Sequence, residues 1–356
     1  MLFLSPFLLI LGLMQLAASR LGLCGLSLTG RRRRLGYLVG AVLFVAGVWL
    51  LPATPWVFAA LLPAGGLALA VLVSLGSLAG RELDPARFLR PGDWPEARCR
   101  AVQIPHGENA IPGLLITPWD AGQAAVCLVH GSGDNKTAFK WRLIRALLRR
   151  GLAVLTIDLA GHGENQAVQR WPDCTAEIPT ALCWLRQALG MRGVGLLGVS
   201  MGGALSAHAA AAARPDALAI CEAPISFRFT RRMVRREVWR LLCSPILDML
   251  GETTWWQIRR IWDTGRGQRE IALAELIERL DVPGQVARLS CPLHLVYGQC
   301  DDIAPPEHGL RLREAAAGPV RLTMVPRASH LALTLMPETG DVLADWFAEQ
   351  LDGSNA

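Results

Sequence analysis

The hydrophobic pattern of the chain changes sharply near residue 80. Before that point apolar residues run almost without interruption, and no Asp or Glu occurs among residues 1–80. A helix needs about 20 predominantly apolar residues to cross a membrane, and about 17 can suffice. We therefore expect a membrane anchor of about three transmembrane helices in residues 1–80, formed by the apolar stretches 2–19, 35–51 and 56–79.

Charged residues in the anchor predict its orientation. Four consecutive arginines, 31–34, lie in the loop between the first two expected spans, and further arginines follow the third span. Basic loops stay in the cytoplasm, so the main domain would also be cytoplasmic, in a multi-pass protein of a bacterial inner membrane. A cleaved signal peptide at 1–19 is the alternative, because "QLAAS" resembles a cleavage site, but the basic start of such peptides is missing.

From about residue 98 short β-rich runs alternate with helical stretches. Continuous apolar runs such as "AAVCLVHG" (124–131) are typical of strands covered on both faces. This alternation predicts an α/β domain, a mostly parallel, doubly wound sheet with helices on both faces. We expect residues 81–97 to be a linker and the core to comprise 98–226 and 292–351. Ligands of such sheets bind at the carboxyl ends of the strands.

Charge and cysteine content exclude several classes of protein. The net charge is +6, but removing the five arginines within residues 1–80 from the 36 basic residues leaves 31, against 30 acidic residues. The excess charge therefore belongs to the apolar segment and does not indicate nucleic-acid binding. The nine cysteines include no C-x-x-C pair, and several lie in apolar runs. We interpret them as packed thiols in a reducing compartment, with no metal site.

The stretch "VGLLGVSMGGALSAHAA" (194–210) places a serine between an apolar strand and a helix. Ser200 is the centre of a Gly-x-Ser-x-Gly motif, with Gly198 and Gly202 on either side. Such a nucleophile elbow needs glycines because the turn is too sharp for β-carbons at those positions. The elbow exposes the serine above the sheet, at the N-terminus of the following helix, where N–H groups can stabilise an oxyanion.

Residues 98–351 resemble the α/β-hydrolase fold family, and the lidded arrangement resembles its serine-aminopeptidase and monoacylglycerol-lipase-like branch. The resemblance rests on motifs in the family's order: "HGSG" (130–133), "DLAGHGEN" (158–165), "GVSMGG" (198–203), "YGQCDDIAPP" (297–306) and "VPRASHLAL" (325–333). In the second motif Asn165 replaces the family's common serine. The family's chain order of nucleophile, acid and histidine is kept.

This resemblance implies a catalytic triad. Ser200 would be the nucleophile, His330 the base that takes its proton, and Asp301 the carboxylate that orients the imidazole. Asp302, one residue later, is the alternative acid.

The resemblance also implies an oxyanion hole. Its two N–H groups would come from Met201 and Ser132, with Gly133 as the alternative to Ser132. It implies neither a metal nor a cofactor.

Residues 227–291 are expected to form a helical cap or lid. Their first helix carries one continuous basic face, made by arginines 228, 231, 232, 235 and 236. That face could lie on an anionic membrane surface or simply face solvent. Tryptophans 239, 255, 256 and 262 would suit either an acyl pocket or packing within the lid.

Together these features predict a membrane-anchored serine hydrolase. It would cleave carboxylic ester or thioester bonds through an acyl-Ser200 intermediate, acting on small-molecule or lipid-like esters in contact with membrane lipids. An acyltransferase would use the same triad, and a non-catalytic membrane-tethered scaffold is a third reading that the intact Ser200, Asp301 and His330 disfavour. The sequence does not determine the oligomeric state.

Overall fold

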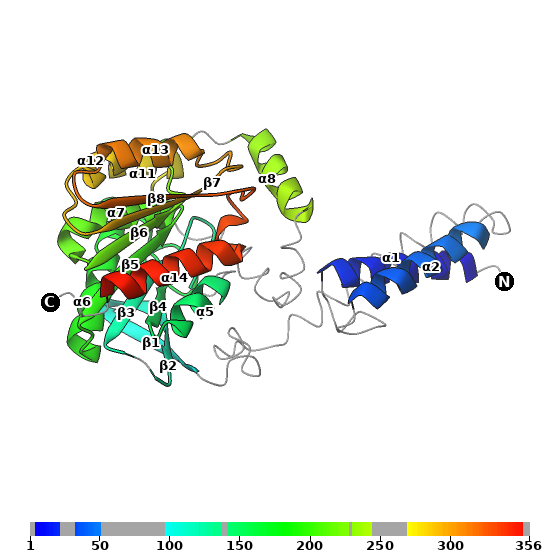
Figure 1. Ribbon diagram of the computed structural model, residues 1–356, viewed down its shortest axis with the longest axis horizontal. Helices are drawn as coiled ribbons and strands as arrows, with labels where there is room; N and C mark the ends of the chain where they lie inside the picture. Colours follow the sequence, from blue (N-terminus) through cyan, green and yellow to red (C-terminus); the bar gives the residue numbers. More distant parts are fainter. Residues whose placement is uncertain are drawn as a thin grey trace. The chain divides into compact units, whose positions relative to one another are not determined.

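The computed structural model describes residues 4–21, 33–50, 97–120, 122–136, 141–227, 230–243 and 269–351. The chain divides into two compact units. The described part of the first contains helices α1 and α2, and the second contains every strand that the structure describes (Figure 1). The expected third span at 56–79 and almost all of the expected linker lie outside the described residues.

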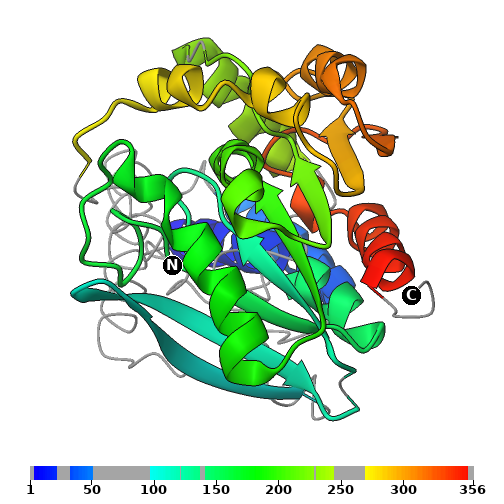
Figure 2. The ribbon, with the colours of Figure 1, turned by 90° about the vertical axis from the view of Figure 1, so that its left-hand side faces the viewer.

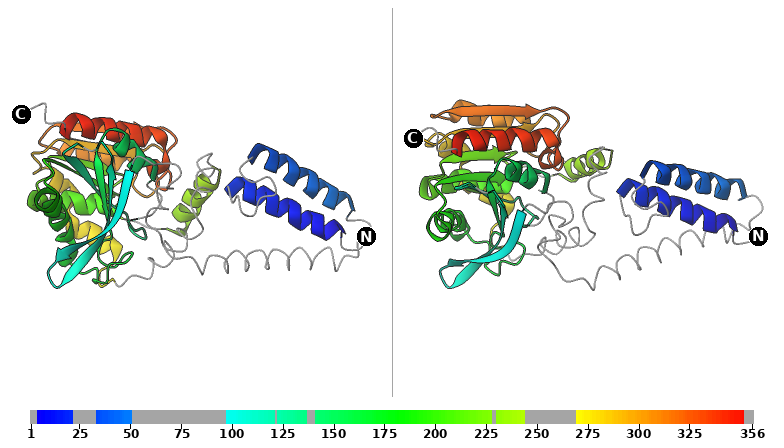
Figure 3. Two further views of the ribbon diagram at one scale, coloured as in Figure 1. Left: turned by 90° about the horizontal axis from the view of Figure 1, so that it is seen from below. Right: turned by 60° about the horizontal axis from the view of Figure 1, so that its bottom comes forward.

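Helices α1 (Leu4–Leu21) and α2 (Arg33–Leu50) pack side by side as a hairpin (Figure 3). Their backbones approach closely at glycines. A β-carbon on Gly12 would lie 2.6 Å from the backbone nitrogen of Phe44, and one on Gly47 would lie 2.8 Å from that of Leu9. Small residues at such crossings allow tight helix–helix contact.

The hairpin buries three polar side chains and exposes several large apolar ones. Ser5, Gln15 and Ser19 are buried, and the Ser5 hydroxyl donates a hydrogen bond of 2.8 Å to the carbonyl of Gly47. The exposed large apolar side chains are Phe7, Leu13, Leu35, Leu38, Val42, Val45, Val48 and Trp49.

Neither helix of this hairpin is assigned as a membrane span. In the part of the chain that the structure describes, no helix combines the length and apolar character needed to cross a bilayer. The expected spans at 2–19 and 35–51 coincide in position with α1 and α2 but find no support on this criterion.

The second unit is built on an eight-stranded sheet in the order β1-β2-β4-β3-β5-β6-β7-β8. The β1–β2 hairpin at one edge is antiparallel, and β2 pairs antiparallel with β4, whereas all later neighbours are parallel (Figure 2). The strands are β1 (Ala97–His106), β2 (Asn109–Pro118), β3 (Ala124–Val129), β4 (Ala153–Ile157), β5 (Gly193–Val199), β6 (Ala217–Cys221), β7 (Leu293–Gly298) and β8 (Val320–Val325). The mostly parallel, doubly wound sheet predicted from the sequence is confirmed.

Helices cover both faces of this sheet and bury a separate apolar cluster on each. One face packs against α5 (Trp141–Arg149) and α14 (Pro337–Leu351), which also contact each other. The other packs against α6 (Glu177–Leu189), α7 (Met201–Ala213) and α13 (Pro306–Ala315). The central strands are buried throughout, which explains their continuous apolar sequences.

The expected lid, 227–291, is only partly described, and its described ends differ from each other. Helix α8 (Arg231–Cys243) exposes Trp239 and several arginines. In contrast, α11 (Leu273–Leu280) and α12 (Val282–Val286) bury Leu276, Leu280 and Val286 in the same apolar cluster as α7. The last part of the insertion therefore packs as a layer of the core.

Candidate active site

The carboxyl end of β5 turns directly into α7, and Ser200 occupies the turn. Its backbone angles, a φ of 53° and a ψ of −120°, lie in a region that residues other than glycine rarely adopt. The turn is possible because glycines occupy the positions two residues before and two residues after the serine. A β-carbon on Gly198 would lie 2.4 Å from the carbonyl oxygen of Gly202, and one on Gly202 would lie 2.4 Å from that of His130. The predicted elbow geometry is present.

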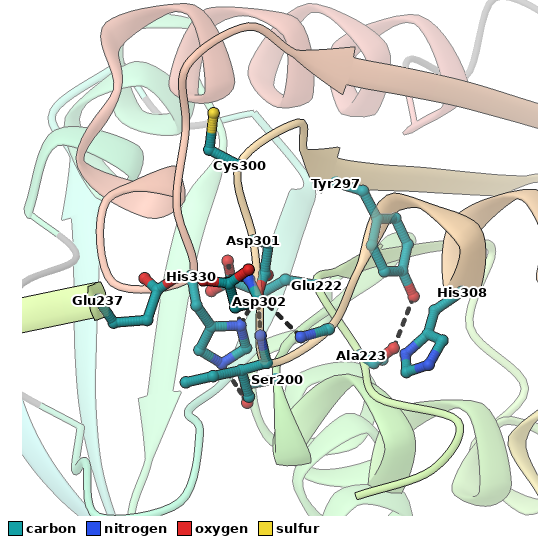
Figure 4. A network of polar contacts seen from close by, with 12 residues as sticks. Ser200, Glu222, Ala223, Glu237, Tyr297, Cys300, Asp301, Asp302, His308 and His330 are labelled. Carbon is teal, nitrogen blue, oxygen red and sulfur yellow. Dashed lines mark hydrogen bonds and ion pairs between the residues drawn. The ribbon is translucent and has the colours of Figure 1, made fainter. Parts of the chain in front are cut away.

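Ser200, His330 and Asp301 form one hydrogen-bonded chain (Figure 4). The Nδ1 of His330 lies 2.8 Å from Oδ2 of Asp301, and its Nε2 lies 2.9 Å from the hydroxyl of Ser200. An ionised carboxylate only accepts hydrogen bonds, so Nδ1 donates to it and Nε2 of the neutral ring is left to accept the serine proton. The structure thus brings together the three residues that the sequence singled out for a triad.

The backbone holds the Asp301 carboxylate in place. Its other oxygen, Oδ1, accepts hydrogen bonds of 2.7 Å and 2.8 Å from the N–H groups of Ile303 and Ala304. Asp301 is almost fully buried, and these bonds compensate for the water that its charge has lost. The carboxylate is therefore fixed in the orientation that the His330 ring requires.

Asp302, the alternative acid, points to different partners. Its carboxylate forms ion pairs with Arg236 at 3.2 Å and Arg240 at 2.9 Å, both on α8. Arg240 also donates to the carbonyl of Cys300 and to Glu237. Two of the helix's basic residues thus contact the acid loop, whereas Arg231, Arg232 and Arg235 are exposed.

The sequence reasoning missed Glu222. This residue directly follows β6 and is buried, and its Oε2 lies 3.8 Å from Nδ1 of His330 (Figure 4). The acidic residue at the carboxyl end of a parallel strand, in "AICEAP", is the signal that could have revealed it. Side-chain atoms of Glu222, Asp301 and His330 that could bind a metal ion lie within 4.8 Å of one another. The hydrogen bond between Asp301 and His330, however, fits a proton relay.

The two carboxylates alter the basicity of His330. Burial alone would lower the pKa of this imidazole, but the negative charges of Glu222 and Asp301 outweigh that effect and raise the pKa to about 9. The cation formed when His330 accepts a proton is therefore strongly stabilised in this site.

The predicted oxyanion residues lie in the two segments next to Ser200. Met201 is the first residue of α7, so its N–H has no acceptor within the helix. On the other side a β-carbon on Gly131 would lie 3.7 Å from the Ser200 hydroxyl, which places the "HGSG" loop beside the nucleophile. Ser132 follows in that loop, and Gly133 after it adopts a φ of 75°.

Two buried histidines hold this loop and the "DLAGHGEN" loop, and the first of them links the two. His130 lies 2.8 Å from the carbonyl of Gly131 through Nδ1, and its Nε2 accepts a 3.1 Å hydrogen bond from the N–H of Leu159. Nδ1 of His162 is 2.9 Å from the carbonyl of Ala160. A carbonyl can only accept, so both rings carry their proton on Nδ1. Both histidines thus hydrogen-bond to backbone groups.

Asn165, where the family's serine was expected, joins the same network. Its amide nitrogen donates to the carbonyl of Asp158 at 2.9 Å and to Glu177 at 2.7 Å. Burial raises the pKa of Glu177 to about 7 despite these hydrogen bonds.

A family model described as "Alpha/beta hydrolase family" matches residues 128–346. The matched region contains the elbow, the acid loop and the histidine loop. The chain belongs to the alpha/beta hydrolase family. This membership, the sheet order and the site geometry agree with one another.

Curated relatives of this alpha/beta hydrolase act on different substrates, to judge by their names. The chain is 24% identical over 251 residues to a pimeloyl-[acyl-carrier protein] methyl ester esterase of Pseudoalteromonas atlantica, covering 61% of this chain and 91% of that protein. It is 32% identical over 114 residues to bifunctional epoxide hydrolase 2 of Sus scrofa, but this match covers only 20% of the latter and 30% of this chain.

Solved structures share the fold. A thermophilic esterase from Thermogutta terrifontis matches with a TM-score of 0.52 and 21% identity, covering 71% of this chain and 99% of that one. The structure of DcsB in complex with its substrate analogue matches with a TM-score of 0.54 and 15% identity, covering 72% and 100%. At these identities the likeness concerns the fold alone.

Proposed function

We propose that this protein is a serine hydrolase that cleaves carboxylic ester or thioester bonds. The observation that carries the proposal is the continuous hydrogen-bonded chain from the Ser200 hydroxyl through His330 to Asp301. A serine hydroxyl is a weak nucleophile until a neighbouring base can accept its proton. The name of the methyl ester esterase relative supports an ester as the bond that is cleaved.

The proposed reaction begins with attack of the Ser200 oxygen on the carbonyl carbon, while the serine proton moves to Nε2 of His330. The negative carbonyl oxygen of the tetrahedral intermediate would accept hydrogen bonds from the N–H groups of Met201 and Ser132. When the carbonyl re-forms, the bond to the leaving oxygen or sulfur breaks, and His330 returns the proton to that atom. The products of this half are an alcohol or thiol and acyl-Ser200.

Water completes the cycle in the same geometry. The oxygen of a water molecule attacks the acyl carbon while His330 takes a proton from that water. His330 then gives the proton to the departing Ser200 oxygen. A carboxylic acid leaves and the free serine is restored. Asp301 keeps its charge throughout and stabilises the imidazolium in both halves. An alcohol in place of water would make the reaction an acyl transfer.

The proposal includes attachment to a membrane through the α1–α2 hairpin. Water-soluble helices turn polar residues outward, but this hairpin buries Ser5, Gln15 and Ser19 and exposes a row of apolar side chains. Its close contacts run through glycines. Small residues and polar groups between helices, with apolar groups outside, are the arrangement expected in lipid. Lipid-like esters would then be within reach of the site.

Covalent labelling tests the proposed chemistry. A fluorophosphonate probe reacts only with an activated serine, so we expect it to label the wild-type protein and to fail on Ser200→Ala. Asp302→Asn is the matched control and should still be labelled. Product analysis with and without an added alcohol then separates hydrolysis from acyl transfer. A folded wild type that is not labelled would contradict an active triad and favour the scaffold.

A further inference from the structure

Arg269 lies against the predicted oxyanion loop and has no role in the proposed triad chemistry. Its backbone forms an isolated β-bridge with Gln169, which fixes its position. Its guanidinium donates from Nη1 to the hydroxyl of Ser132 at 3.1 Å and from Nη2 to Nε2 of His162 at 2.8 Å. Arg269 is therefore held in place at both its backbone and its side chain.

The partners of this arginine are neutral. Burial, together with His130, lowers the pKa of His162 to about 3, and its proton sits on Nδ1, so its Nε2 accepts from Arg269 as a neutral base. Within the described residues no carboxylate forms an ion pair with Arg269. The adjacent Glu270 pairs instead with Arg170, at 2.6 Å.

A partly buried cation with only neutral partners is unusual, because burial costs free energy that an acidic partner normally offsets. Burial lowers the pKa of Arg269. Among the described residues its buried Nε has no hydrogen-bond partner. Holding a hydroxyl and an imidazole does not require a full positive charge, since neutral donors could do so.

Arg269 is also close to the proposed reacting atoms. It contacts Ser132, which follows the glycine that lies beside Ser200. Its bridge partner Gln169 donates a 3.6 Å hydrogen bond to the sulfur of Met201. The arginine is thus linked to both predicted oxyanion residues, the first directly and the second through one side chain.

We propose that Arg269 binds a carboxylate of the substrate, so that the preferred esters carry a carboxylate at the far end of a short acyl chain. A guanidinium offers several N–H donors in one plane, which suits the two oxygens of a carboxylate. The carboxylate of the substrate would be the acidic partner that Arg269 does not have among the described residues. This assignment rests on the proposed function, because it refines the substrate class of the same site.

Two methyl esters of equal chain length test it. Monomethyl adipate carries a carboxylate at the end opposite to the ester, and methyl hexanoate carries a methyl group there. At low ionic strength we expect the wild type to show the higher kcat/KM for monomethyl adipate. Arg269→Gln should lower that preference about ten- to a hundred-fold, as expected for the loss of a hydrogen-bonded charge, and Arg269→Lys should retain part of it. Arg170→Gln, which removes a charge already paired with Glu270, should leave the preference unchanged.

A binding measurement separates this proposal from the catalytic one. Calorimetry on Ser200→Ala should show tighter binding of monomethyl adipate than of methyl hexanoate, and adding Arg269→Gln should abolish the difference. If this binding difference were found but the wild type turned over neither ester, the proposed function would be contradicted and the carboxylate site would stand. Equal binding of both esters to Ser200→Ala, or equal loss of both activities in Arg269→Gln, would show a structural role and overturn the carboxylate site.

Discussion

The Oε2 atom of Glu222 lies 3.8 Å from Nδ1 of His330, although Asp301 already accepts the hydrogen bond of that nitrogen. Two buried carboxylates thus face one imidazole, and they raise its pKa to about 9. A protonated His330 cannot accept the proton of Ser200. The two carboxylates therefore stabilise the imidazolium that forms during the reaction, but they leave few molecules with a neutral His330 at neutral pH.

This relationship predicts an alkaline pH profile. Only neutral His330 can act as the base, so kcat/KM should rise with pH and level off above about pH 9. Glu222→Gln removes a negative charge that stabilises the imidazolium, so the rising limb should move to lower pH. The exposed Glu278→Gln serves as the control. An unchanged limb in Glu222→Gln would show that this carboxylate does not act on His330.

The two consecutive aspartates should respond differently to the same change. Asp301→Asn replaces an acceptor of the His330 proton with an amide and should lower kcat about a thousand-fold or more, by disturbing the imidazole tautomer. Asp302→Asn breaks ion pairs with α8 and should leave kcat within a few-fold of the wild type. Steady-state kinetics on one ester measures both. Equal losses would contradict the division of roles.

The elbow should not tolerate a single methyl group. In Gly198→Ala the added carbon would lie 2.4 Å from the carbonyl oxygen of Gly202 and 2.5 Å from the hydroxyl of Ser206. We expect a loss of about 1–3 kcal/mol in the free energy of unfolding, as for other overpacked sites. Denaturant titration measures it. Gly122→Ala, where nothing lies within 4 Å of the new carbon, should be close to neutral.

The hairpin should hold the protein in membranes. We expect the protein to stay in the pellet after an alkaline carbonate wash and to dissolve in detergent. Val45 is 64% exposed on α2, so Val45→Lys would place a charge against lipid and should shift protein to the supernatant. Leu310→Lys adds the same charge at an exposed position of α13, outside the hairpin, and is the control. Release of the wild type by carbonate would contradict attachment by the hairpin.

Tags at the two ends test the topology predicted from the arginine-rich loop. Three spans put Met1 and Ala356 on opposite sides of the membrane. Protease protection of each tag measures this, and two tags on one side would contradict three spans.

Much of the fold and the site could be predicted because local rules determine them. A strand buried on both faces must be apolar along its length, and a strand–serine–helix turn needs glycines at fixed offsets. These patterns predicted β3, β5 and the Ser200 elbow. The family resemblance already favoured Asp301 over Asp302, and the structure adds the physical difference, because the two neighbouring carboxylates contact different partners.

The missed features depend on contacts between distant segments. Glu222 follows β6 and His330 follows β8, and the two meet because β6, β7 and β8 lie side by side in the sheet. The role of Arg269 depends on its distance from Ser132, 137 residues away in sequence. The burial of α11 against α7 is a further contact of this kind, because the apolar face of that helix predicts burial but not the element that it packs against.

Helix α8 meets the loop of Asp301 through the ion pairs of Asp302, whose arginine partners are partly exposed. Salt weakens such exposed pairs but leaves the buried sheet untouched. Because Asp301 and Asp302 share a peptide bond, a displacement of α8 reaches the carboxylate that orients His330 through a single backbone link. The two N–H groups that hold Oδ1 of Asp301 oppose such a displacement, so the orientation of His330 does not depend on the ion pairs of its neighbour Asp302.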